Sequence, residues 1–163
     1  GDAGAPAVGV LVMTTTMLLI LLGAWVAFNV IAPYSVLARA EQISPGRLPA
    51  ELLIWPKDQQ VRFYMMSLTG GYGYSVWAPP LNLVVFDRVF FARASPALIR
   101  YVVAHELAHF ALGHHRKRWF AVVTGVVLLP AVRRWLLRME EEADAVAAAR
   151  TGFPRSAFPE LGG

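Results

Sequence analysis

Residues 105–109 of this chain read His-Glu-Leu-Ala-His. Residues four apart on an α-helix lie on one face, so His105 and His109 can offer two imidazole nitrogens to one zinc ion. Glu106 is then left to accept a proton from a water molecule. This combination of residue types and spacing indicates metal-assisted hydrolysis of a peptide bond.

A catalytic zinc ion takes three protein ligands and keeps a fourth position for water, so one more ligand is needed. The dense carboxylate cluster downstream is Glu140, Glu141, Glu142 and Asp144. Glu140 and Asp144 are four apart and share a helical face, whereas the other two point elsewhere. We expect Glu140 to be the third ligand and Asp144 to accept the free ring N–H of a ligand histidine. The alternative is a solvated acidic face.

The helix that carries the motif is predicted independently of it. Ser95 is suited to cap the helix and Pro96 to occupy its first position. Gly113 predicts its end. Apolar residues recur between these points at intervals of three and four, which is typical of a buried stripe: Leu98, Ile99, Val102, Val103, Leu107, Phe110 and Ala111. His114 and His115 follow Gly113, and we interpret them as helix-end or headgroup-facing residues rather than ligands.

The region before this helix is rich in β-strand patterns. Three strands are predicted, at residues 60–68, 72–77 and 81–86. Glycines at 70 and 71 separate the first two, and prolines at 79 and 80 separate the last two. By themselves, these patterns are consistent with an ordinary hairpin that covers the helices.

The N-terminal segment, residues 1–37, is strongly apolar. No charged residue occurs between Ala3 and Leu37, and residues 8–31 form a nearly unbroken apolar run that is long enough to cross a bilayer. We expect a single transmembrane helix there. A cleaved signal peptide fits less well, because no positive n-region precedes the run. Basic residues follow the run and Asp2 precedes it, which predicts that the catalytic part is cytoplasmic.

A second apolar stretch, residues 119–132, is too short for a membrane span. We expect a membrane-surface or re-entrant hairpin broken near Pro130, with a core helix as the alternative. Six basic residues flank the stretch: Arg116, Lys117, Arg118, Arg133, Arg134 and Arg138. With the net charge of +4, they favour contact with anionic lipid over nucleic acid, for which no binding motif is present. Cysteines are absent, which excludes a disulfide framework and a thiolate metal site.

The sequences HELAHFALGHH, EEEADAVAA and TGFPRSAF together resemble the membrane-associated gluzincin zinc metallopeptidases, which include the CAAX prenyl proteases and the HtpX-like proteases. The resemblance runs from about residue 72 to residue 158. In that family a later ExxxD motif supplies a glutamate ligand, and Glu140 and Asp144 hold these positions. The short separation between His109 and Glu140 points to a reduced version of the fold.

The resemblance implies an α+β fold over residues 38–163. We expect a minimal gluzincin domain, with a small, mainly antiparallel sheet beside the motif-bearing helix and a second ligand-bearing helix. It implies one Zn²⁺ per chain and an edge strand at residues 74–78 that pairs with the substrate backbone. We therefore predict a membrane-anchored zinc endopeptidase that hydrolyses peptides or membrane proteins, with Glu106 as general base. The alternatives are a regulatory sensor that cleaves one signalling partner and a non-catalytic membrane interaction protein.

Overall fold

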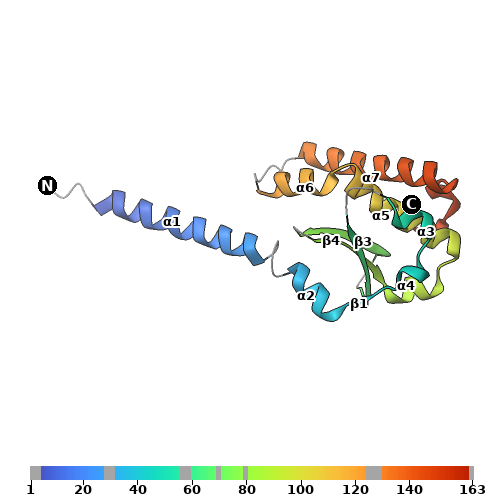
Figure 1. The fold of residues 1–163 in the computed structure, drawn as a ribbon. Helices are drawn as coiled ribbons and strands as arrows, with labels where there is room; N and C mark the ends of the chain where they lie inside the picture. The colour runs from blue at the N-terminus through green and yellow to red at the C-terminus, as the bar shows by residue number, and fades with distance from the viewer. Residues whose placement is uncertain are drawn as a thin grey trace. The chain divides into compact units, whose positions relative to one another are not determined.

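The computed structural model describes residues 5–27, 32–55, 60–68, 71–78, 81–123 and 130–161. The chain divides into two compact units, Gly1–Ala38 and Arg39–Gly163. The first unit contains helix α1 (Ala5–Val26) and most of helix α2 (Ala32–Arg39). The second unit contains every strand and helix from residue 41 onward that the structure describes (Figure 1).

Helix α1 occupies most of the stretch in which we expected a membrane span. Its large apolar side chains between Val12 and Leu22 are exposed, from 57% at Leu22 to 70% at Met13. Within the described residues, however, no helix combines the length and the apolar character that crossing a membrane requires. The span expected at residues 8–31 is therefore not found, and its last four residues lie outside the described part. The cytoplasmic placement inferred from it stays a prediction.

The second unit is built on a four-stranded sheet with the order β1-β2-β4-β3. The strands are β1 (Glu41–Gln42), β2 (Val61–Met66), β3 (Gly73–Ala78) and β4 (Leu81–Asp87). The three strands predicted from the sequence are confirmed with small shifts at their ends. Strand β1 had no sequence signal, because two residues are too few for an alternating pattern.

The sheet is mainly antiparallel, as expected, since two of its three strand pairs are antiparallel, but one parallel pair makes it mixed. Strands β2 and β4 are parallel, and β1 and β3 pair antiparallel on the outside. The parallel pair arises because β3 and β4 form a hairpin that returns β4 to the side of β2, so β3 is at the edge. Strand β4 is central and its residues 83–86 are almost completely buried, which explains their continuous apolar run.

Short elements connect the sheet to the helices. These are η2 (Pro45–Arg47), α3 (Ala50–Leu53) and α4 (Arg88–Arg93). The long helices are α5 (Pro96–Ala111), α6 (His114–Val123) and α7 (Pro130–Thr151), and two 3-10 turns, η4 (Arg155–Ala157) and η5 (Pro159–Leu161), follow. The centre of the predicted hairpin at 119–132 lies outside the described residues. Its flanks belong to α6 and α7, where Ala121 and Val132 are buried.

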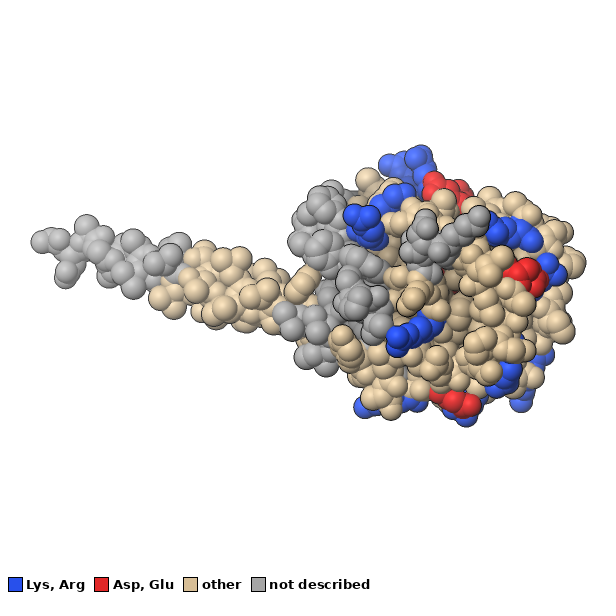
Figure 2. Space-filling view, viewed as in Figure 1, with Lys and Arg blue, Asp and Glu red and all other residues tan. Residues whose placement is uncertain are grey.

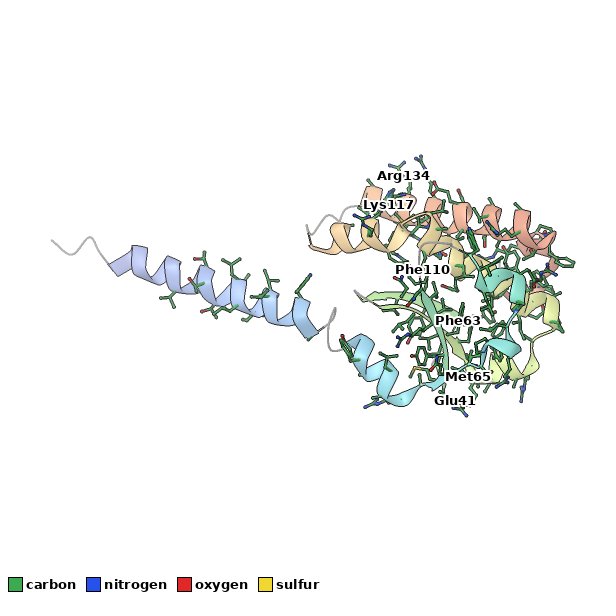
Figure 3. The ribbon with its side chains drawn as sticks, viewed as in Figure 1. Glu41, Phe63, Met65, Phe110, Lys117 and Arg134 are labelled. Carbon is green, nitrogen blue, oxygen red and sulfur yellow. The ribbon has the colours of Figure 1, made fainter. Side chains whose placement is uncertain are left out.

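Helix α5 is the central helix of the unit and packs against both the sheet and α7 (Figure 1). The core joins it to β2 and β4. Phe63 of β2 and Phe110 of α5 both lie in this core (Figure 3). Burial on two sides explains why α5 is apolar nearly all round, apart from the motif. The helix that carries His105 and His109 is thus held rigidly from both faces.

Candidate metal centre

The ends of α5 are fixed by local interactions, as the sequence predicts. The hydroxyl oxygen of Ser95 accepts a hydrogen bond from the Leu98 N–H at 3.2 Å, and Pro96 occupies the first turn. Gly113 ends the helix with φ of 66°, a left-handed conformation that favours glycine. Between these points, His105 and His109 lie one turn apart, and their Nε2 atoms are 3.2 Å from each other.

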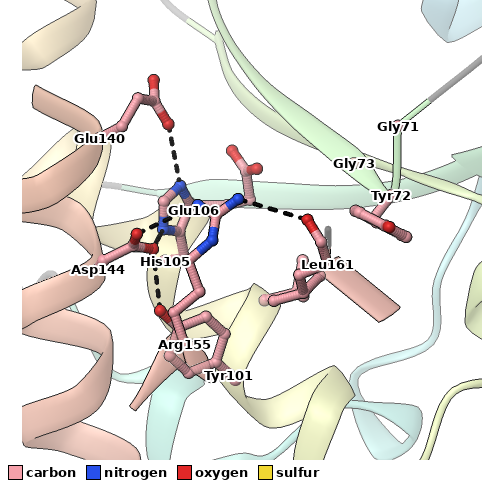
Figure 4. A pocket seen from close by; sticks show the side chains of 11 residues that line it. Gly71, Tyr72, Gly73, Tyr101, His105, Glu106, Glu140, Asp144, Arg155 and Leu161 are labelled. Carbon is pink, nitrogen blue, oxygen red and sulfur yellow. Dashed lines mark hydrogen bonds and ion pairs between the residues drawn. The ribbon is translucent and has the colours of Figure 1, made fainter. Parts of the chain in front are cut away.

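Helix α7 brings Glu140 to these two nitrogens, and Figure 4 shows its contact with His105. Its Oε2 lies 3.4 Å from the His105 Nε2 and 3.6 Å from the His109 Nε2. A tetrahedral zinc ion that is about 2.0–2.1 Å from each ligand separates any two of them by about 3.3–3.4 Å. The three observed separations are close to that value, so His105, His109 and Glu140 could hold one metal ion.

The charges around the triad suit a cation. Hydrogen bonding from His105 and then from His109 lowers the pKa of Glu140, which keeps it an anion. Burial lowers the pKa of His105, but hydrogen bonding to Glu140 and the charges of Glu106 and Asp144 outweigh this, so its pKa is raised overall. Without a cation, the carboxylates thus draw a proton onto His105. A metal ion would have to replace that proton, as ligation of an imidazole requires.

Glu106 lines the same cleft as His105 and Glu140, and this cleft has a volume of about 200 Å³. Glu106 itself is only 8% exposed. The opposite wall is formed by residues 71–73, where β3 begins, and by Leu161 of η5 (Figure 4). The Tyr72 hydroxyl donates to the carbonyl oxygen of Glu160, which fixes η5 beside the start of β3. An extended chain entering this cleft would meet Glu106 and two of the candidate metal ligands together.

Asp144 lies on α7 one turn after Glu140, as the spacing predicts. Its Oδ1 is 2.8 Å from the His105 Nδ1 and accepts a hydrogen bond from the Tyr101 hydroxyl at 2.9 Å. Its Oδ2 accepts a hydrogen bond from Arg155 at 3.1 Å. Burial, and then the bond to Asp144, raises the pKa of Tyr101, so its hydroxyl stays a donor. Asp144 thus contacts the Nδ1 of His105, whereas Glu140 contacts the Nε2 of the same ring.

His114 is a helix-end residue as predicted, since α6 begins with it, but it does not face a headgroup. It is completely buried, and its Nδ1 lies 2.9 Å from the Nδ1 of His109. Its Nε2 is 3.1 Å from the Oε2 of Glu142 on α7. The sequence predicted that α5 ends at Gly113 but not the direction of the chain beyond it. The left-handed turn at that glycine redirects the chain, and α6 begins at His114 with its side chain turned back beneath α5.

His115 is also buried and packs on Phe110, with ring centroids 4.4 Å apart. Burial lowers its pKa to about 3, so it is neutral at physiological pH. It therefore does not face a headgroup, which corrects the second part of the same interpretation. The signal that could have identified both histidines is their position immediately after a helix-ending glycine, where the chain turns sharply.

Residues 89–141 match the family described as YgjP-like, metallopeptidase domain. The matched range begins in α4, includes all of α5 and extends into α7, so it contains His105, Glu106, His109 and Glu140. No curated protein matches the chain. The match supports a zinc metallopeptidase, and the small α+β unit fits a minimal domain of that kind. It does not reach residues 1–88.

Proposed function

We propose that this metallopeptidase-like chain is a zinc-dependent endopeptidase of the gluzincin type, related to the CAAX prenyl and HtpX-like proteases. The observation that carries the proposal is the convergence of two histidines from α5 and a glutamate from α7 beside a second glutamate in an open cleft. A purely structural metal site has no use for Glu106, which ligates nothing in this arrangement. The later Glu140 and Asp144 pair supports the gluzincin type.

In the proposed reaction, the three ligands hold zinc, which would acidify a water molecule and polarise the scissile carbonyl. Glu106 accepts the proton of the attacking water. The same carboxyl group then returns that proton to the departing amine. Its low exposure at the side of the cleft keeps bulk water from competing for the proton. His105 and His109 remain neutral ligands, held by the groups behind them.

We propose that the substrate binds as an extended strand along β3, because β3 is the outer strand of the described sheet and begins at the cleft. The Asp87 N–H donates to the Tyr72 carbonyl, at 3.0 Å. Main-chain groups alternate between inward and outward in an antiparallel pair. Gly73, Ser75 and Trp77 therefore direct theirs away from β4, where a peptide could pair with them.

The variant Ser75→Pro tests this binding mode. Proline removes the outward N–H of residue 75 and leaves the ladder with β4 intact, which is tolerated on an edge strand. The KM for a long peptide should rise severalfold, with a smaller change in kcat. Ser75→Ala is the matched control, because it keeps the N–H, and it should behave as the parent. Equal KM values in both variants would rule out pairing at this position.

The catalytic proposal itself is tested by zinc content and peptide hydrolysis in the parent and in Glu106→Gln. One zinc per chain in both proteins, with cleavage of an unstructured peptide mixture in the parent only, is the expected result. Zinc in both without cleavage of any general peptide would favour a sensor that cleaves one specific partner. Metal-free parent protein, purified without chelator, would refute the peptidase and favour a non-catalytic interaction protein.

Contact with anionic lipid is a separate proposal for the second unit. Basic side chains gather over adjoining parts of α6 and α7 (Figure 2). The six that the sequence singled out are all exposed. Phosphatidylserine vesicles should therefore retain the protein at low salt and release it at high salt. Equal retention by phosphatidylcholine vesicles would refute an electrostatic contact.

A further inference from the structure

His114 joins a ligand histidine to a carboxylate through both of its ring nitrogens. Its Nδ1 is 2.9 Å from the Nδ1 of His109, and its Nε2 is 3.1 Å from the Oε2 of Glu142. The ring is completely buried, so water does not replace either contact. The three side chains come from α5, the first residue of α6, and α7. They form a line that leads from the metal centre to the surface, since the Glu142 side chain is 57% exposed.

The proton positions along this line follow from the geometry. The Nε2 of His109 faces Glu140 and the Nε2 of His105, so it is the nitrogen that would bind a metal and must carry no proton. The neutral ring then has its proton on Nδ1, which donates to the Nδ1 of His114. His114 must in turn carry its own proton on Nε2, and that N–H donates to Glu142. One tautomer for each ring satisfies every contact.

We propose that His114, supported by Glu142, is a positioning residue that fixes the tautomer and the ring orientation of His109 for metal binding. The inference rests on the proposed metal site and adds a function for a residue outside the ligand set. Partners of this kind orient metal ligands, and their loss typically weakens metal affinity by about 10–100-fold. Without an acceptor, the His109 Nδ1–H would be buried and unpaired.

The first experiment measures zinc affinity by chelator competition in two variants that each preserve a different half of His114. In His114→Asn, the amide oxygen occupies the position of Nδ1 and can still accept from His109. In His114→Gln, the amide reaches the position of Nε2 and leaves Nδ1 without a replacement. His114→Asn should bind zinc within about threefold of the parent, and His114→Gln should lose about 10–100-fold.

His115→Gln is the matched control, because His115 is the adjacent buried histidine and its Nε2 has no hydrogen-bond partner in the described residues. Its zinc affinity should equal that of the parent. Equal losses in His114→Asn and His114→Gln would reduce His114 to a packing residue and overturn the proposal. A parent that binds no zinc would instead refute the metal site itself, so the two failures are distinguishable.

A second measurement needs no substitution and remains informative if a variant fails to fold. In the zinc-loaded parent, nitrogen-15 NMR of the histidine rings should show His109 protonated at Nδ1 and His114 protonated at Nε2. The opposite tautomer at His114 would overturn the proposal, since its Nδ1–H would then face the Nδ1–H of His109, and neither could accept a hydrogen bond.

Discussion

The two histidines that we propose as metal ligands have different hydrogen-bond partners on the side of the ring away from Glu140. The His105 side chain is 13% exposed, and its partner Asp144 also accepts hydrogen bonds from Tyr101 and Arg155. The His109 side chain is 4% exposed, and its partner is a neutral, buried imidazole that has one carboxylate behind it. The partner of His105 is thus a carboxylate with several hydrogen bonds. The partner of His109 is a buried ring with one further contact, to Glu142.

The difference indicates which of the two histidines has a partner that is held by more than one contact. Asp144 can lose one donor and still be held by the others, because each contact fixes the same carboxylate. His114 has no such reserve, since each of its nitrogens makes one contact. We expect zinc affinity to change little when one residue that contacts Asp144 is substituted. We expect it to depend strongly on His114, the partner of His109.

Removing the ligand that both sides share should have the largest effect. Glu140→Ala leaves two histidines, which do not complete a catalytic zinc site. Zinc should be lost during purification and hydrolysis should be abolished. Elemental analysis and a peptide assay check this. Glu141→Ala is the control, because Glu141 is exposed and adjacent, and it should retain one zinc per chain. Full zinc content in Glu140→Ala would mean that another side chain is the third ligand.

Removing the partner of His105 should have an intermediate effect. Asp144→Ala leaves the His105 Nδ1 without its acceptor and should weaken zinc binding by about 10–100-fold. Asp144→Asn keeps an acceptor oxygen and should lose less. Chelator competition provides both values. If the alanine variant loses much less than His114→Gln, then the two sides differ in dependence on the partner itself, and the comparison becomes sharper.

Removing one contact behind Asp144 should have a small effect on zinc. Tyr101→Phe deletes a hydroxyl that donates to Asp144, while His105 and Arg155 remain. Zinc affinity should stay within about threefold, because this is well below the loss expected for a partner itself. The free energy of unfolding should fall by about 1.5–3 kcal/mol, since a hydrogen bond to a charged group is lost. A tenfold loss of affinity would contradict the redundancy of this side.

The sequence predicted the His105 side better than the His109 side, and the reason is geometric. His105, Glu140 and Asp144 lie within long helices, where a spacing of four residues determines which side chains share a face. The contact between His109 and His114 crosses a left-handed turn, after which helical periodicity no longer applies. Glu142 was not predicted to be a ligand because it does not share the helical face of Glu140. On its own face it contacts His114.

The fold shows the same limit. Apolar runs and paired glycines or prolines predicted strands β2, β3 and β4. They did not predict that β2 and β4 are parallel, because pairing depends on the path of the chain between strands, which hydrophobic pattern does not encode. The candidate third ligand, Glu140, was predicted from local spacing. The packing of α7 against α5, which brings it to the two histidines, is a tertiary property.

A substitution far from the candidate metal centre should lower the stability of the fold. It should leave the tautomers of His105 and His109 unchanged. Asp87 accepts hydrogen bonds from the backbone N–H groups of Leu68 and Phe90, which lower its pKa below 3.8. Its ionised form is therefore the one that stabilises the fold. That contribution is complete above the pKa of the unfolded chain and is lost as the pH falls through the lower pKa of the folded state.

Asp87→Asn keeps one acceptor oxygen, but it replaces the other with an NH2 donor and removes the charge. The metal-free variant should therefore melt a few degrees below the metal-free parent at neutral pH. The two melting temperatures should converge as the pH falls below the ordinary aspartate pKa of about 3.9 and through the lower pKa of the folded state. Thermal unfolding monitored by circular dichroism across this range checks both points. A constant difference at every pH would show that shape, rather than charge, explains the effect. Changed tautomers of His105 or His109 in the zinc-loaded variant would mean that the sheet and the metal centre are coupled.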